Sequence, residues 1–154
     1  MESLLTLFAS LTESLSALTE LAKRKTTAVR KNDLLALDQI LKEEQAQALT
    51  LRGLDQKRTA LLQKLDLQDV PLSALPARAP AALQQKTRVA VESLKSAYQI
   101  YNSAATTARN TLECNLHEIE RFLAAAGADP VTSSQGYRPD DVDAPPPMKA
   151  DFRA

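Results

Sequence analysis

The residue types that most often carry chemistry gather in one short stretch of the chain. They are Glu113, Cys114, His117, Glu118 and Glu120. On a helix, Cys114 and His117 could meet, either as two ligands of a zinc ion or as a nucleophile and its base. The sequence holds only one Cys and one His, too few for a zinc site, and it has no glycine-rich loop for an oxyanion or a phosphate. We therefore expect an ordinary helix surface with no catalytic residue, no metal ion and no cofactor, in a protein that is not an enzyme.

The overall composition narrows the class of protein further. Nineteen Lys and Arg balance nineteen Asp and Glu, which argues against a surface for nucleic acid, and the basic run Lys23–Lys25 is better explained as a solvated helix end. Aromatic residues make up 4% of the chain and glycines number three, so the core must be built from Leu and Ala on helices. The single Cys fits a reducing compartment. No signal peptide or membrane-spanning run is recognisable. These features predict a cytoplasmic protein without stable membrane insertion.

The prolines divide the chain into segments. All eight lie beyond residue 70, and a proline inside a helix costs about 3 kcal/mol. Long helices are therefore predicted at about 2–30, 33–66 and 81–126, within a bundle domain of residues 1–127. The Pro- and Asp-rich residues 128–154 should form a flexible tail, because they bury too little apolar surface to offset their ordering entropy. The predicted fold is all-α, an elongated antiparallel bundle or coiled coil of three long helices.

The first segment carries a heptad seam that only Lys25 interrupts. Its apolar residues alternate at steps of four and three, and they are Leu4, Phe8, Leu11, Leu15, Leu18, Ala22 and Val29. A seam of this kind packs along its whole length against other helices. Asn32 and Asp33 follow it, and either can cap a new helix. We expect a tight turn there rather than one long bent helix.

The second segment has apolar residues along one side. They are Leu34, Leu37, Ile40, Leu41, Ala48, Leu51, Leu54, Leu61, Leu62 and Leu65. Glu44 and Arg58 fall on or beside this seam, where they either pair between helices or lie at its edge. The joint at residues 67–80 is broken by prolines, yet it keeps Leu67, Val70, Leu72 and Leu75. It should therefore lie against the bundle.

The three segments differ in length, and this difference predicts a binding surface. At 1.5 Å per residue they would span roughly 43, 48 and 69 Å, so the third helix should extend past its partners by about 20 Å or bend. Its late apolar positions, Leu112, Leu116, Ile119 and Leu123, would then lack an internal cover. An exposed apolar stripe on a helix is typical of a surface that binds another helix. A homodimer, or cover by the joint, remains the alternative.

The order of these features resembles the FlgN-type flagellar export chaperones over nearly the whole chain. The Leu-heptad helix is followed by basic residues and then by Asn32-Asp33-Leu34, the short polar turn that leads into a Leu-rich helix. Arg58 precedes the pair Leu61-Leu62, and Tyr137 lies beside a Gly in the tail. The Pro-broken joint and the long third helix match as well.

The resemblance implies a cytoplasmic chaperone that binds the C-terminal helical region of hook–filament junction (hook-associated) proteins. It would keep these proteins unassembled and deliver them to the flagellar type III export gate. The stripe Leu112, Leu116, Ile119 and Leu123 would hold the client, and Tyr137 would contact export-gate components. Two alternatives use the same helices: a structural coiled-coil homo-oligomer, and a helical adaptor outside flagella.

Overall fold

The computed structural model describes residues 1–127, and this part of the chain is all-α, as predicted, with no strand. The described residues fall into two units, Met1–Asn115 and the part that begins at Leu116. The helices are α1 (Glu2–Arg30), α2 (Leu34–Lys64), the 3₁₀ turn η1 (Leu72–Ala74), α3 (Leu75–Arg78), the 3₁₀ turn η2 (Ala81–Leu83) and α4 (Gln84–Ala125). The predicted flexible tail, 128–154, lies outside the described residues.

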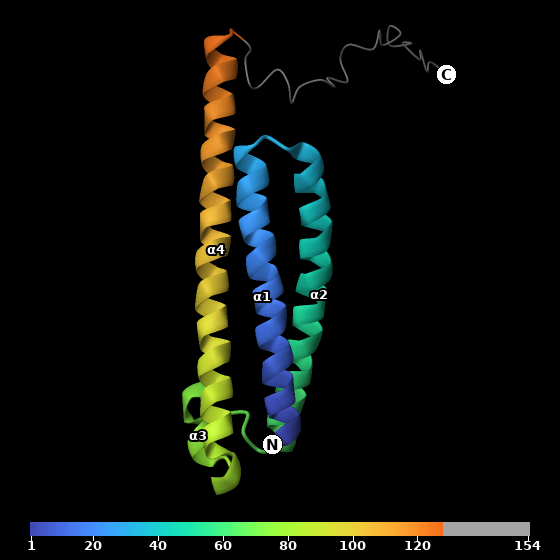
Figure 1. The fold of residues 1–154 in the computed structure, drawn as a ribbon, viewed down its shortest axis with the longest axis vertical. Coiled ribbons are helices and arrows are strands. Elements are labelled where there is room, and N and C mark those ends of the chain that lie inside the picture. Colours follow the sequence, from blue (N-terminus) through green and yellow to red (C-terminus); the bar gives the residue numbers. More distant parts are fainter. Residues whose placement is uncertain (128–154) are drawn as a thin grey trace, which may run out of the picture. The chain divides into compact units, whose positions relative to one another are not determined.

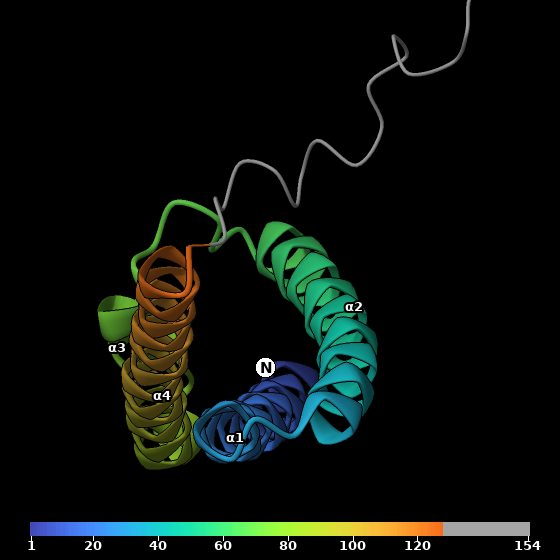
Figure 2. The same ribbon diagram turned by 90° about the horizontal axis from the view of Figure 1, so that it is seen from above.

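α1 is the central helix of the unit Met1–Asn115. It lies between α2 and α4, whose backbones diverge from each other (Figures 1 and 2). Thirteen of its residues are buried, including every residue of the predicted heptad seam, whereas α2 buries two. Because apolar neighbours cover α1 on two sides, its seam is the core of the unit. Successive long helices run in opposite directions, so α1 and α4 are parallel (Figure 1).

The predicted turn between the first two helices is present. Asn32 has φ +53°, a left-handed conformation that Asn tolerates better than most residues. Asp33 is the N-cap of α2, and its Oδ1 accepts a hydrogen bond from the backbone N–H of Ala36 at 3.0 Å. The backbone N–H of Asp33 in turn donates to the carbonyl oxygen of Ala28 at 3.0 Å. These bonds close the end of α1 and start α2 within three residues.

The proline joint lies against the core, as predicted, but it also contains a helix that the sequence reading missed. Leu75 is 1% exposed and belongs to the main core cluster, with Leu67, Val70 and Leu72 packed against that cluster. Leu75 opens the short helix α3, with Pro76 in its first turn. Proline is tolerated at that position because the first backbone N–H groups of a helix have no partner within it.

The apolar side predicted for α2 is only partly buried. Leu34 and Leu41 are 76% and 46% exposed, and Ala48 is exposed as well. The reason is geometric. α2 packs closely along α1, while α4 lies on the other side of α1 (Figure 2). Part of the apolar side of α2 is therefore left open to solvent.

The last long helix ends as the sequence predicts. Gly127 has φ +76°, the conformation that favours Gly just past a helix end. Before that point, Asn115 Nδ2 donates a hydrogen bond to Asn32 Oδ1 at 3.1 Å. This contact ties α4 to the turn between α1 and α2 within the unit Met1–Asn115.

Candidate functional site

The residues singled out for chemistry lie on the surface of α4. Cys114 is an exposed free thiol. His117 Nδ1 is 3.9 Å from Glu120 Oε2, and both side chains are largely exposed. Within residues 1–127, no three Cys, His, Asp or Glu side chains are grouped to hold a metal ion. The arrangement is that of a solvated helix face.

A groove between α2 and α4, lined also by residues of α1, is more apolar than four other cavities on the described chain. We call it the α2–α4 groove. It encloses about 540 Å³ and lies within the unit Met1–Asn115. Its apolar lining comes from four elements and includes Leu11, Leu15, Leu51, Leu72, Leu94 and Tyr101. A pocket of this size lies in the range of about 300–1,000 Å³ that is typical of binding sites.

Charged side chains form the rim of the α2–α4 groove. They are Arg52, Asp55 and Arg58 of α2 and Lys95 of α4. Arg58 Nε donates to Asp55 Oδ1 at 2.8 Å. Arg58 thus pairs within its own helix. The sequence had left open whether Arg58 pairs between helices or lies at the edge of the seam, and in the structure it does not pair between helices. Arg52 and Lys95 are exposed. The rim therefore carries three cations and one carboxylate, and that carboxylate is already paired.

Glu44 of α2, by contrast, pairs between helices, with Lys25 of α1. Lys25 Nζ, the charge that interrupts the heptad seam, lies 2.6 and 2.8 Å from the two carboxylate oxygens of Glu44. The side chains are only 19% and 25% exposed. Tyr101 of α4 lies near this pair. Burial raises the pKa of its phenol above the ordinary 10.0, and the negative charge of Glu44 adds to the shift.

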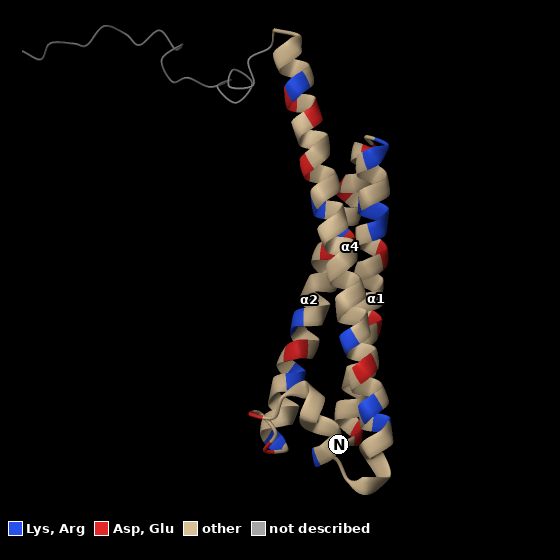
Figure 3. Cartoon of the chain, turned by 90° about the vertical axis from the view of Figure 1, so that its left-hand side faces the viewer, with Lys and Arg blue, Asp and Glu red and all other residues tan. Residues whose placement is uncertain are grey.

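The basic end of α1 is matched by acidic residues of α2. Arg24 Nη1 donates to Glu43 Oε2 at 2.7 Å, and this hydrogen bond holds the pKa of Glu43 below its ordinary 4.5, with Gln39 adding to the effect. Acidic and basic residues also alternate along the helices seen in Figure 3. The arrangement is that of two helices tied by ion pairs.

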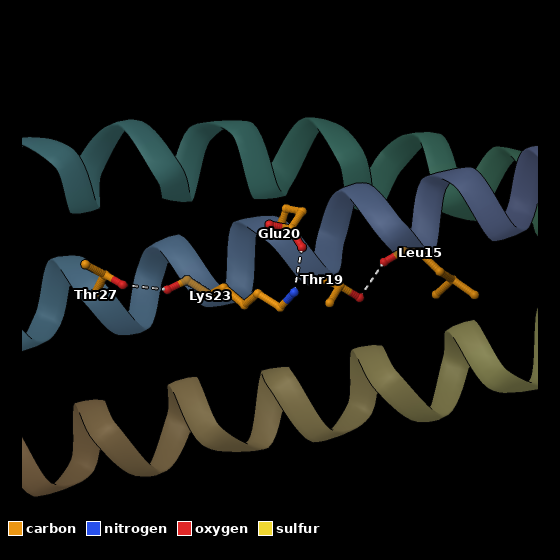
Figure 4. Close-up of polar contacts among 5 residues, drawn as sticks. All are labelled: Leu15, Thr19, Glu20, Lys23 and Thr27. Carbon is orange, nitrogen blue, oxygen red and sulfur yellow. Dashed lines mark hydrogen bonds and ion pairs between the residues drawn. The ribbon is translucent and has the colours of Figure 1, made fainter.

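The surface between α1 and α4 is more polar. Two cavities there are lined largely by Ser, Thr and charged residues. Hydroxyls on α1 bond back to their own helix: Thr19 Oγ1 donates to the Leu15 carbonyl at 2.8 Å, and Thr27 Oγ1 donates to the Lys23 carbonyl at 3.2 Å (Figure 4). Lys23 Nζ also pairs with Glu20 at 2.7 Å. These hydroxyls bond to backbone carbonyls of α1 itself, and the two cavities on this side have a more polar lining than the α2–α4 groove.

The predicted client stripe lies on α4. Leu112 and Leu123 are half-buried, while Leu116 and Ile119 are 52% and 45% exposed. Steps of four, three and four residues place all four on one face of the helix. Phe122 is 73% exposed, and the sequence reading missed it because the residue lies outside the seam. Tyr137 lies outside the described residues.

Comparisons with known proteins identify the family. Residues 1–142 match the family model described as FlgN protein. No curated protein and no solved structure gives a significant match. None of the helices described is long and apolar enough to cross a membrane. Because the match covers almost all of the 154 residues, the chain belongs to the FlgN family of flagellar export chaperones.

Proposed function

We propose that this protein binds the C-terminal helical region of hook-associated (hook–filament junction) proteins in the cytoplasm. It keeps them unassembled by covering the helices through which they would polymerise, and it delivers them to the flagellar type III export gate. Membership in the FlgN family supports this function. The proposal involves no catalysis, no metal ion, no cofactor and no nucleic acid.

The observation that carries the proposal is the apolar stripe on α4. Leu116 and Ile119 are large aliphatic side chains that remain about half exposed, and Leu112 and Leu123 continue the same face. Burying one such side chain completely stabilises a complex by about 1.5–3 kcal/mol. Half of that gain is still open to a partner at Leu116 and Ile119. Together they would contribute about 1.5–3 kcal/mol, which is roughly a 10- to 100-fold change in affinity.

The test replaces the two most exposed members of the stripe. Leu116→Asp with Ile119→Asp should weaken binding of a hook-associated protein's C-terminal helical segment by at least about tenfold. The matched control is Leu35→Asp, a more exposed leucine at the start of α2 that lies outside the stripe. Affinity is measured by titration calorimetry, and helicity by circular dichroism. Equal binding by both folded variants would contradict the client site.

The export-gate contact is proposed for Tyr137. Tyr137→Ala should leave client binding unchanged and reduce secretion of the client from flagellated cells. Loss of client binding by this variant would instead assign Tyr137 to the client site. Normal secretion would remove its proposed role at the gate.

A homodimer is the alternative partner for the exposed apolar residues. Sedimentation equilibrium at micromolar concentration separates the two possibilities. A monomer that forms a one-to-one complex with the client agrees with a chaperone. A stable dimer that the stripe variants dissociate would assign the stripe to self-association.

A further inference from the structure

We propose that the α2–α4 groove binds one amphipathic helix with acidic flanks, supplied by the exported client as a second contact besides the stripe on α4. The identity of the client rests on the function proposed above. The chemistry of the bound helix rests on the groove itself.

The shape and lining of the groove favour a helix. Its lining residues come from α2, α4 and α1, and Figure 2 shows the backbones of α2 and α4 on either side of α1. The apolar side chains come from all three helices and from η1, so a stripe at heptad spacing would meet apolar partners on both sides. Ala48, an exposed residue on the apolar side of α2, also lines this groove.

Two tyrosines suit the α4 wall to such a partner. Tyr98 and Tyr101 both line the groove, and Tyr98 is exposed. Tyrosine is enriched where proteins bind one another, because its ring packs against apolar groups while its hydroxyl remains available for hydrogen bonds. The two residues are three positions apart, so they lie on the same face of α4.

The positive charge of the rim favours a docked helix whose residues beside the apolar stripe are acidic. Arg52, Arg58 and Lys95 face a single carboxylate, Asp55, which Arg58 already binds at 2.8 Å. Residues that flank the apolar stripe of a docked helix would lie close to this rim. Glutamates at those positions would meet the exposed cations Arg52 and Lys95, whereas lysines would meet like charges.

The first experiment uses synthetic peptides. Each is an amphipathic helix of about 18 residues with Leu at the heptad a and d positions, and the flanks carry either Glu or Lys. The Glu peptide should bind the full-length protein about tenfold more tightly than the Lys peptide. Arg52→Glu with Lys95→Glu should reverse the preference, and both residues are exposed, so the fold should survive. Equal binding of the two peptides by the wild-type protein would overturn the proposal.

The second experiment locates the site. Ala48→Asp places a carboxylate in the groove and should lower the affinity for the Glu peptide at least about tenfold. Ala46→Asp is the matched control, because Ala46 is also exposed on α2 but does not line the groove. Circular dichroism and melting of both variants confirm folding. Equal affinities of the two folded variants would exclude the groove.

The same variants, tested with the client segment, separate this inference from the proposed function. If Ala48→Asp weakens client binding and Ala46→Asp leaves it unchanged, the result supports both the groove inference and the proposed function. Client binding that neither variant changes would overturn the groove as a client contact and leave the chaperone function intact. A wild-type protein that binds the Glu peptide in the groove but no client would overturn the proposed function and, with it, the client as the source of the helix.

Discussion

The half-buried ion pair between α1 and α2 gives the most specific test of how this bundle is held together. Lys25 occupies a seam position that would otherwise be apolar, and its Nζ lies 2.6 Å from Glu44. Exposed pairs contribute about 0–1 kcal/mol, whereas breaking a fully buried pair costs about 3–5 kcal/mol. With side chains 19% and 25% exposed, this pair lies between those limits. We expect Lys25→Leu to lower the free energy of unfolding by about 1–3 kcal/mol, because it leaves the Glu44 carboxylate without a cation.

The reciprocal change should cost less. In Glu44→Leu the Lys25 ammonium can swing toward water on its flexible stem, so the loss should be about 0.5–1.5 kcal/mol. The double variant Lys25→Leu with Glu44→Leu joins two apolar side chains across the seam. Its free energy of unfolding should return to within about 1 kcal/mol of the wild-type value or exceed it, because apolar replacements of buried ion pairs are often neutral or stabilising.

Urea unfolding followed by circular dichroism measures all three variants, with the slope checked for constancy. Lys23→Leu is the matched control. Its partner Glu20 is also close, at 2.7 Å, but both side chains are more than 60% exposed, so the change should stay within about 0.5 kcal/mol. If the losses in the two single variants simply add in the double variant, with coupling below about 0.3–0.5 kcal/mol, the pair does not stabilise the α1–α2 contact and the reasoning is refuted.

Three further predictions follow from the described residues. Phe8→Ala, at a side chain that is completely buried, should lower the free energy of unfolding by about 3–5 kcal/mol; a loss below about 1 kcal/mol would show that the core there is not close-packed. Asp33→Ala removes the hydrogen bond accepted from Ala36 and should cost about 1 kcal/mol, whereas Asp33→Asn should retain most of the stability, both read from thermal melting. The lowered pKa of Glu43 means that its contact with Arg24 stabilises the fold above pH 4.5 and is lost as the pH falls through the folded-state pKa. Glu43→Gln should therefore flatten the acid side of the stability–pH curve, and an unchanged curve would argue against this contact.

The helix boundaries were predictable because local features set them. Proline is disfavoured in the interior of long helices, Asp33 caps the start of α2, and Gly127 adopts a left-handed conformation just past the end of α4. Each effect depends on a few neighbouring residues. The short helix α3 was missed because four residues give no periodic pattern, and its burial depends on Leu75 reaching a core built by α1, α2 and α4.

The two candidate surfaces differed in how far they could be predicted. The stripe on α4 follows from spacing along one helix, and the exposure of Leu116 and Ile119 agrees with it. The α2–α4 groove could not be found in this way, because its lining combines residues as far apart in sequence as Leu11 and Tyr101. Phe122 was not predicted because it lies beside the heptad seam, and seam spacing does not identify exposed residues next to the seam.

By itself, the sequence determined that this chain forms three long helices joined by a tight turn and a proline-broken joint, and it indicated the family. Those properties come from periodicity, capping and backbone restriction, which act over a few residues. Only the tertiary structure decided that α1 lies in the middle, that Lys25 pairs with Glu44 while Arg58 does not cross between helices, and that part of the apolar side of α2 remains open beside a groove. All three helices carry apolar stripes of similar period. Which stripe becomes the core therefore depends on how the helices are placed around one another, and heptad spacing does not encode that placement.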